Sequence, residues 1–119
     1  MTRIAILGAG TAGTTIANRL ARRYHRELAG GRTSITVVDQ DNVHVYQPGL
    51  LFLPFGIYRP DQVVKPRAPQ LRKGISYIQQ PIDRVDADRD VVLLADGRAV
   101  PYDLLVVATG TRVLPEETD

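Results

Sequence analysis

The chain has 119 residues, a formal net charge of +2 and an apolar content of 44%, which suits one domain with a hydrophobic core. The positive charge is too small and too evenly spread to indicate a nucleic-acid partner. The absence of cysteine excludes disulfides, thiolate metal sites and redox thiols within these residues.

No apolar run approaches the roughly 20 residues that a membrane-spanning helix needs. Residues 1–13 lack the long apolar stretch of a signal peptide, because a glycine-rich turn interrupts them. These features predict a cytoplasmic chain. The two histidines lie far apart in the sequence, so we predict no metal site.

Residues 3–13, RIAILGAGTAG, combine a short apolar strand with three glycines at the spacing of a phosphate-binding turn. Gly8 can adopt the backbone angles of a tight strand-to-helix turn, and a side chain at Gly10 would separate the main chain from a pyrophosphate. Glycine at position 13 lets the next helix approach the strand. A helix that begins near Thr11 would direct its free N–H groups toward the phosphates. Glycine triplets also occur by chance in loops, so the flanking elements decide the interpretation.

Those flanking elements are consistent with a nucleotide site. Apolar residues at helical spacing over 14–28 predict a helix, which ends near Gly30. Its arginines fall on the opposite side and indicate a solvated face. Residues 35–39, ITVVD, form a β-branched run typical of a strand covered on both faces. Asp39 at its end would accept hydrogen bonds from ribose hydroxyls. Residues 3–39 thus predict a parallel βαβ unit.

The segment 42–60 contains NVHVYQPGLLFLPFG, whose prolines and glycines preclude a regular helix or a central strand throughout. Its large apolar residues either pack as a loop core or approach a cofactor ring or a partner surface. His44 and Tyr46 in this segment either serve that ring or simply pack.

The remaining residues predict short elements in a regular order. A short helix is expected at 69–73 and a third strand at 75–79. Asp-Gly at 96–97 is a strong hairpin signal, and it predicts a three-stranded antiparallel meander over 82–101. A buried strand at 104–108 then leads into the turn Ala108-Thr109-Gly110.

The expected fold class is therefore α/β, a Rossmann-like parallel sheet of the FAD/NAD(P)-binding kind with an inserted three-stranded antiparallel β-meander. Residues 1–119 would form a single, incomplete domain.

Three ordered motifs resemble the FAD-binding part of the pyridine nucleotide-disulfide oxidoreductase superfamily. They are GAGTAG with Asp39, the meander after the third strand, and YDLLVVATG. The resemblance covers essentially the whole chain. The last motif separates it from a plain NAD-binding Rossmann domain, which does not return through a meander into an ATG turn.

The apolar loop narrows the resemblance. Disulfide reductases of the glutathione reductase type place a redox cysteine pair shortly after the second strand, whereas this chain has HVYQPGLL and no cysteine. The loop is similar to that of type II NADH dehydrogenases and sulfide:quinone oxidoreductases, and its GLLFLPFG continuation favours the sulfide:quinone group. Both groups pass electrons through FAD to a membrane quinone.

The resemblance implies FAD contacts at matching positions. The glycine turn would hold the pyrophosphate, Asp39 the adenosine ribose and Gln40 the adenine side. Pro48 would lie near the flavin, and Ile82 would offer backbone groups to the adenine. For Pro48, Ile82 and Arg112, packing or surface roles are equally open. The implied cofactor-binding set is Gly8, Gly10, Thr11, Ala12, Gly13, Asp39, Gln40, Pro48, Ile82, Ala108, Thr109 and Gly110.

The resemblance also implies further parts of a parent enzyme: a nicotinamide-type domain where NAD(P)H could act as substrate, a later Gly-Asp motif and a C-terminal membrane-docking region. The parent would then be a peripheral protein on the cytoplasmic membrane face, and the 119-residue chain would be inactive by itself. Self-association through residues 50–55 is expected if a partner surface is missing. The alternative is a stand-alone, non-catalytic NAD/FAD-binding module.

Overall fold

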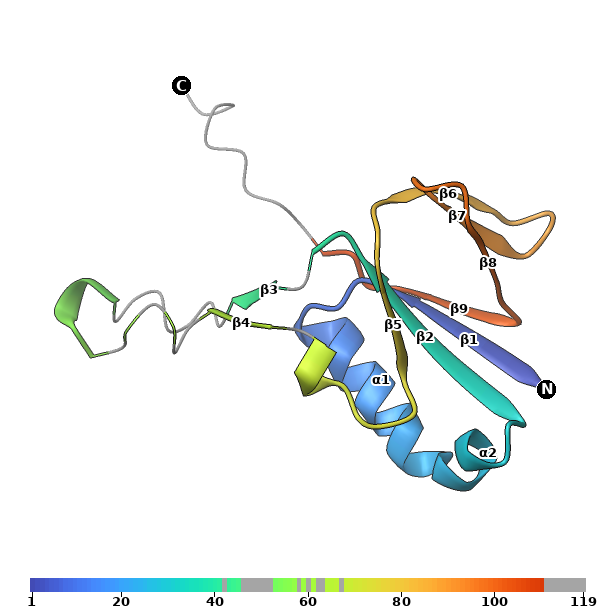
Figure 1. Ribbon diagram of the computed structural model, residues 1–119, viewed down its shortest axis with the longest axis horizontal. Coiled ribbons are helices and arrows are strands. Elements are labelled where there is room, and N and C mark those ends of the chain that lie inside the picture. Colours follow the sequence, from blue (N-terminus) through green and yellow to red (C-terminus); the bar gives the residue numbers. More distant parts are fainter. Residues whose placement is uncertain are drawn as a thin grey trace.

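The computed structural model describes residues 1–41, 43–45, 53–57, 59, 61, 64–66 and 68–110, with the backbone alone for 43–45 and 64. A four-stranded parallel sheet of order β5–β2–β1–β9 forms its centre (Figure 1). The Rossmann-like parallel sheet predicted from the sequence is confirmed. The strands are β1 (Thr2–Leu7), β2 (Thr33–Asp39), β5 (Ser76–Gln79) and β9 (Leu104–Val107).

Two helices, α1 (Thr11–Arg23) and α2 (His25–Ala29), connect β1 to β2. The sequence predicted one continuous helix over 14–28. This prediction is wrong, because the backbone leaves the helical region at Tyr24 (φ −108°, ψ 32°). The apolar spacing runs unbroken through Tyr24, and no glycine or proline marks the break. Helical periodicity alone therefore could not reveal it.

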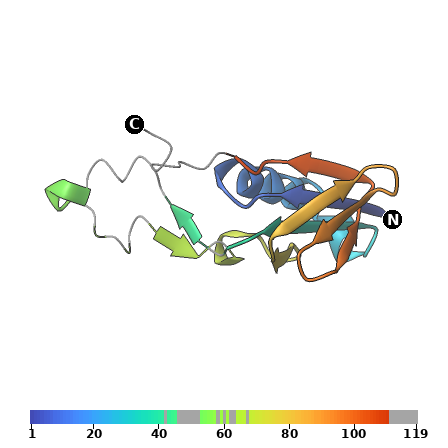
Figure 2. The same cartoon turned by 90° about the horizontal axis from the view of Figure 1, so that it is seen from above.

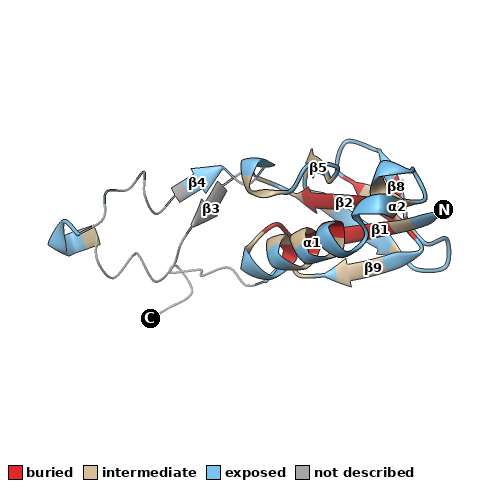
Figure 3. Cartoon of the chain, turned by 90° about the horizontal axis from the view of Figure 1, so that it is seen from below, coloured by how far each residue is buried: buried red, intermediate tan, exposed pale blue. Residues whose placement is uncertain are grey.

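The two central strands β1 and β2 are covered on both faces, which explains their apolar residues. Strand β9, expected from the sequence to be buried, is an edge strand in which Leu104 and Val107 are largely exposed. Alternate residues of β1 divide between two cores, with Ile4 and Ile6 facing α1 and Ala5 and Leu7 facing the meander. Figure 1 shows α1 on one side of the sheet and the meander on the other. Figure 3 shows buried residues gathered on β1, β2 and the inner side of α1.

The meander consists of β6 (Ile82–Asp86), β7 (Val91–Leu94) and β8 (Ala99–Pro101), paired antiparallel in that order. It confirms the predicted three-stranded insertion. Gly97 has φ +90° in the turn between β7 and β8, a conformation that glycine supplies without strain. Val92, Leu94 and Val100 bury the inner face of the meander against the sheet.

The region between β2 and β5 contains a short antiparallel pair, β3 (Val43–Val45) with β4 (Val64–Pro66). Figures 1 and 2 both place this pair well away from the meander. The pairing was not predicted, because its partners are some 20 residues apart with no hairpin signal between them. A 3₁₀ helix η2 (Ala68–Gln70) replaces the helix expected at 69–73.

Part of the apolar segment 50–55 is described. Residues 53–55 form a 3₁₀ turn in which Leu53 is half-buried and Phe55 is 77% exposed. Residues 50–52 lie outside the described part of the chain. No helix among the described residues has the length and apolar character needed to cross a membrane.

Candidate dinucleotide site

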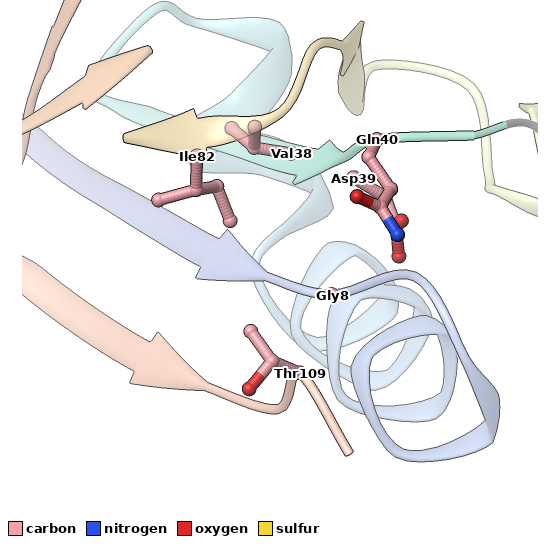
Figure 4. A pocket seen from close by; sticks show the side chains of 6 residues that line it. All are labelled: Gly8, Val38, Asp39, Gln40, Ile82 and Thr109. Carbon is pink, nitrogen blue, oxygen red and sulfur yellow. The ribbon is translucent and has the colours of Figure 1, made fainter. Parts of the chain in front are cut away.

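A cavity of about 230 Å³ opens at the carboxyl ends of the parallel strands. In open parallel sheets this edge is where ligands bind. Figure 4 shows the side chains that converge on it from β2, from the start of β6 and from the turn after β9. The lining residues are Gly8, Val38, Asp39, Gln40, Ile82 and Thr109. All of these except Val38 belong to the set proposed from the sequence.

The glycine turn after β1 is tightly packed. Gly8 has φ +101°, and a Cβ there would lie 2.2 Å from the carbonyl oxygen of Ala108. A Cβ on Gly13 would lie 1.8 Å from the carbonyl oxygen of Gly8. Both glycines are therefore required by the fold itself, Gly8 by its backbone angle and its neighbour, and Gly13 by its neighbour alone.

Backbone hydrogen bonds fix the ends of three adjacent strands around this turn. The Gly8 N–H donates to the Val38 carbonyl at 2.8 Å, and the Ala108 N–H donates to the Leu7 carbonyl at 2.8 Å. The turn after β9 is thus held directly beside the glycine turn. The sequence motifs at residues 8–13 and 108–110, about 100 residues apart, therefore lie side by side at the edge of the dinucleotide cavity.

Gly10 has a different environment from the other two glycines. A Cβ at this position would meet no atom of the described residues within 4 Å. Gly10 also caps the N-terminus of α1 without a side-chain hydrogen bond, and the first turn of α1 contains no acidic residue. The first N–H groups of a helix lack intrahelical acceptors and carry partial positive charge. This end of α1 is therefore open and suited to an anion.

Asp39 has a structural contact that sequence reasoning missed. Its Oδ2 accepts a hydrogen bond of 2.7 Å from the Ala9 backbone N–H, and its Oδ1 accepts a longer one of 3.4 Å from the Asp41 N–H. Asp39 thereby ties the glycine turn to the end of β2. Nothing in the local sequence reveals a bond between residues 30 positions apart.

The other proposed site residues fall into two groups. Thr11 and Ala12 are exposed in the first turn of α1, and Gly110 adopts φ +70° beyond β9. Pro48, Tyr46 and Arg112 lie outside the described residues, and the side chain of His44 is likewise not described.

Val38 lines the cavity but was not proposed from the sequence, because its burial beneath the meander marks it as a core residue. Among the described residues, no three His, Cys, Asp or Glu side chains gather in a metal-binding arrangement.

The family model for pyridine nucleotide-disulphide oxidoreductases matches residues 2–117 of this chain. The chain belongs to this family. The match extends over the glycine turn, the meander and the ATG turn together, so all the elements that form the cavity are part of it.

Curated relatives of this family member include sulfide:quinone oxidoreductases. The chain is 27% identical over 110 residues to the mitochondrial enzyme of Dictyostelium discoideum, covering 92% of this chain and 23% of that protein. It is 34% identical over 109 residues to apoptosis-inducing factor 1 of Saccharomyces cerevisiae, covering 92% of this chain and 27% of that protein. The chain thus spans about a quarter of the length of these relatives.

Solved structures show the same fold. The sulfide:quinone oxidoreductase of Aquifex aeolicus superposes with a TM-score of 0.72 at 22% identity, covering 98% of this chain and 27% of that one. The structure of NDH2 from Plasmodium falciparum gives a TM-score of 0.71 at 20% identity, covering 98% of this chain and 23% of that one. At these identities the comparison shows a shared fold, which agrees with the family that the sequence match gives.

Proposed function

We propose that this chain is the FAD-binding portion of a flavoprotein oxidoreductase that passes electrons from sulfide or NADH through FAD to a quinone. The observation that carries the proposal is the shared cavity at the strand ends, where the glycine turn, Asp39 and the ATG turn meet. Similarity to sulfide:quinone oxidoreductases supports the choice of donor and acceptor.

The described residues fit a dinucleotide. The open space at Gly10 and the uncapped start of α1 suit a pyrophosphate, which would receive the N–H groups of Thr11 and Ala12. Asp39 already fixes the glycine turn through Ala9, and we propose that its carboxylate also accepts ribose hydroxyls. Gln40 and Ile82 would border the adenine side, and Thr109 would close the phosphate side.

The flavin, when bound, supplies the two-electron redox chemistry, and the protein supplies binding and orientation. The role of this chain is therefore to hold the nucleotide end of the cofactor. Because the chain spans about a quarter of its relatives, we propose that it does not turn over by itself and that the remainder of the parent enzyme completes the pocket.

Titration of the chain with FAD and, separately, with NAD tests this function. We expect FAD to bind more tightly, with a saturable change in flavin fluorescence, and we expect no sulfide- or NADH-dependent quinone reduction. Tighter binding of NAD would contradict the FAD assignment and favour a non-catalytic NAD module. Quinone reduction by the 119-residue chain would contradict the proposed dependence on further domains.

A further inference from the structure

A second cavity, of about 330 Å³, lies at the opposite end of the fold from the dinucleotide site. It is bounded by α2 and by the turn that leads into β5, which Figure 1 shows beside α1 and α2. Because β5 runs parallel to β2, this turn precedes the amino end of a strand. The dinucleotide cavity, in contrast, lies at the carboxyl ends.

The lining of this cavity divides into two kinds of surface. Ala21, Leu28 and Ala29 provide an apolar side, whereas His25, Arg72 and Lys73 provide a basic side. None of the described residues that line the cavity is acidic. Within the described part of the chain, neither Arg72 nor Lys73 forms an ion pair. The two cationic side chains are therefore available to a ligand.

The basic turn is fixed in position by α1. The side-chain amide of Asn18 donates to the Gln70 carbonyl at 2.9 Å, and its oxygen accepts from the Arg72 N–H at 2.8 Å. Leu71 packs against the core between the sheet and α1, and Gly74 turns the chain into β5 with φ +97°. The turn that carries Arg72 and Lys73 is therefore already ordered without a ligand, which reduces the entropy lost on binding.

We propose that this cavity binds a small organic carboxylate with an apolar body. Small-molecule sites begin at roughly 300 Å³ and combine a mainly apolar lining with a few placed polar groups. The apolar body would lie against Leu28 and Ala29, while the carboxylate receives charge-assisted hydrogen bonds from Arg72 and Lys73. This cavity lies toward the amino ends of the parallel strands and the dinucleotide cavity lies at their carboxyl ends, so we expect the two ligands to bind independently.

Titration of the chain with hexanoate, followed through the backbone amide signals by NMR, tests the site. We expect saturable shifts of the Leu28 and Gly74 amides, unchanged when FAD is present. The double variant Arg72→Gln/Lys73→Gln should bind hexanoate roughly tenfold more weakly, the loss expected for charge-assisted hydrogen bonds. The matched control Arg84→Gln/Arg89→Gln removes two exposed cations from the meander and should leave the affinity unchanged.

Two matched probes separate the contributions of charge and apolar body. Acetate has the charge without the body, and hexan-1-ol has the body without the charge, so each should bind at least roughly tenfold more weakly than hexanoate. Acetate binding as tightly as hexanoate would indicate an adventitious ion only and overturn the proposal. Equal binding of hexan-1-ol, an unaffected double variant or the absence of saturable shifts would also overturn it.

Discussion

A Cβ atom on Gly13 would lie 1.8 Å from the backbone carbonyl oxygen of Gly8. Helix α1 thus passes the end of β1 at a distance that only glycine permits, since real Cβ atoms do not approach a carbonyl oxygen so closely. The third glycine of the motif therefore serves packing of the helix on the strand, whereas the second faces open space.

Replacing Gly13 by alanine should destabilise the fold. The new methyl group meets backbone atoms that cannot rotate away, so α1 must shift, at a cost of about 3 kcal/mol. We expect the melting temperature to fall by roughly 10 °C or more, measured by circular dichroism. A Gly13→Ala chain that melts at the wild-type temperature would show that α1 moves without cost.

Replacing Gly10 by alanine should affect FAD binding and not the stability of the fold. Position 10 has φ −75°, which alanine adopts readily, and within the described part of the chain its Cβ would meet no atom within 4 Å. We expect an unchanged melting temperature but an FAD affinity reduced by roughly tenfold or more, because the methyl group would occupy the space of the pyrophosphate. Flavin fluorescence titration measures the affinity. Unchanged affinity would mean that the pyrophosphate does not pass Gly10.

Substitutions at Asp39 should separate its two roles. Asp39→Ala leaves the buried Ala9 N–H without its acceptor, which should reduce stability by about 1–3 kcal/mol. Asp39→Asn keeps an oxygen for that N–H and should melt near wild type, yet bind FAD roughly tenfold more weakly because a carboxylate is the stronger acceptor for ribose hydroxyls.

Chemical denaturation and FAD titration of both variants check this prediction. Equal loss of stability in Asp39→Asn and Asp39→Ala would show that the charge, and not the acceptor, holds the glycine turn. Unchanged FAD affinity in Asp39→Asn would remove the ribose from the proposed contacts.

The sequence predicted those parts of the fold that have a local signal. The glycine spacing at Gly8, Gly10 and Gly13, the β-branched run before Asp39 and the Asp-Gly turn each follow from the backbone preferences of a few adjacent residues. Of the residues that line the dinucleotide cavity, Gly8 and Asp39 followed from these local signals, whereas Gln40, Ile82 and Thr109 were implied by the resemblance to the family.

The features that sequence reasoning missed depend on tertiary contacts. The break at Tyr24 interrupts a regular apolar spacing, and the Asp39–Ala9 hydrogen bond joins residues 30 positions apart. The approach of Ala108 to Gly8 spans 100 positions. None of these features has a signal in the local sequence. Each depends on residues that are distant in the chain and pack against the site in the folded protein.

Protonation of Asp103 should release a contact between β1 and the residue that precedes β9. The side-chain and backbone hydrogen bonds from Arg3 lower the pKa of the Asp103 carboxyl below its ordinary value of 3.8. A carboxyl with a lowered folded-state pKa contributes stability above its unfolded value, and this stability is lost as the pH falls through the folded value. The contribution should therefore be present at neutral pH and be lost in acid, as the pH falls below the ordinary value of 3.8 and through the lowered folded-state pKa.

The measurement compares melting temperatures of the wild type and Asp103→Asn across this pH range. We expect a small gap at neutral pH, as both side chains are partly exposed, and its closure in acid. Asp83→Asn is the matched control, since Asp83 is exposed on β6 and forms no ion pair within the described residues. A difference in melting temperature that persists in acid would show that the substitution acts through packing and not through the charge of Asp103.

Self-association of the chain should involve the free edge of the sheet. Among the described strands, β9 pairs with β1 alone, and two of its apolar side chains, Leu104 and Val107, are 57% and 66% exposed. A cavity of about 530 Å³ lies between this strand and the apolar side of α1. Unpaired apolar edge strands favour pairing with another chain, so this edge adds a second candidate surface to the one expected at residues 50–55.

Sedimentation velocity over a range of concentrations distinguishes the two surfaces. The double variant Leu104→Lys/Val107→Lys should shift the chain toward monomer, because inserted lysines oppose edge-to-edge pairing. Val85→Lys, on a half-exposed residue of the separate meander, should leave the distribution unchanged. If Phe55→Ser shifts the chain toward monomer and the β9 variant does not, the association depends on the segment 50–55, and the edge of the sheet is not an interface.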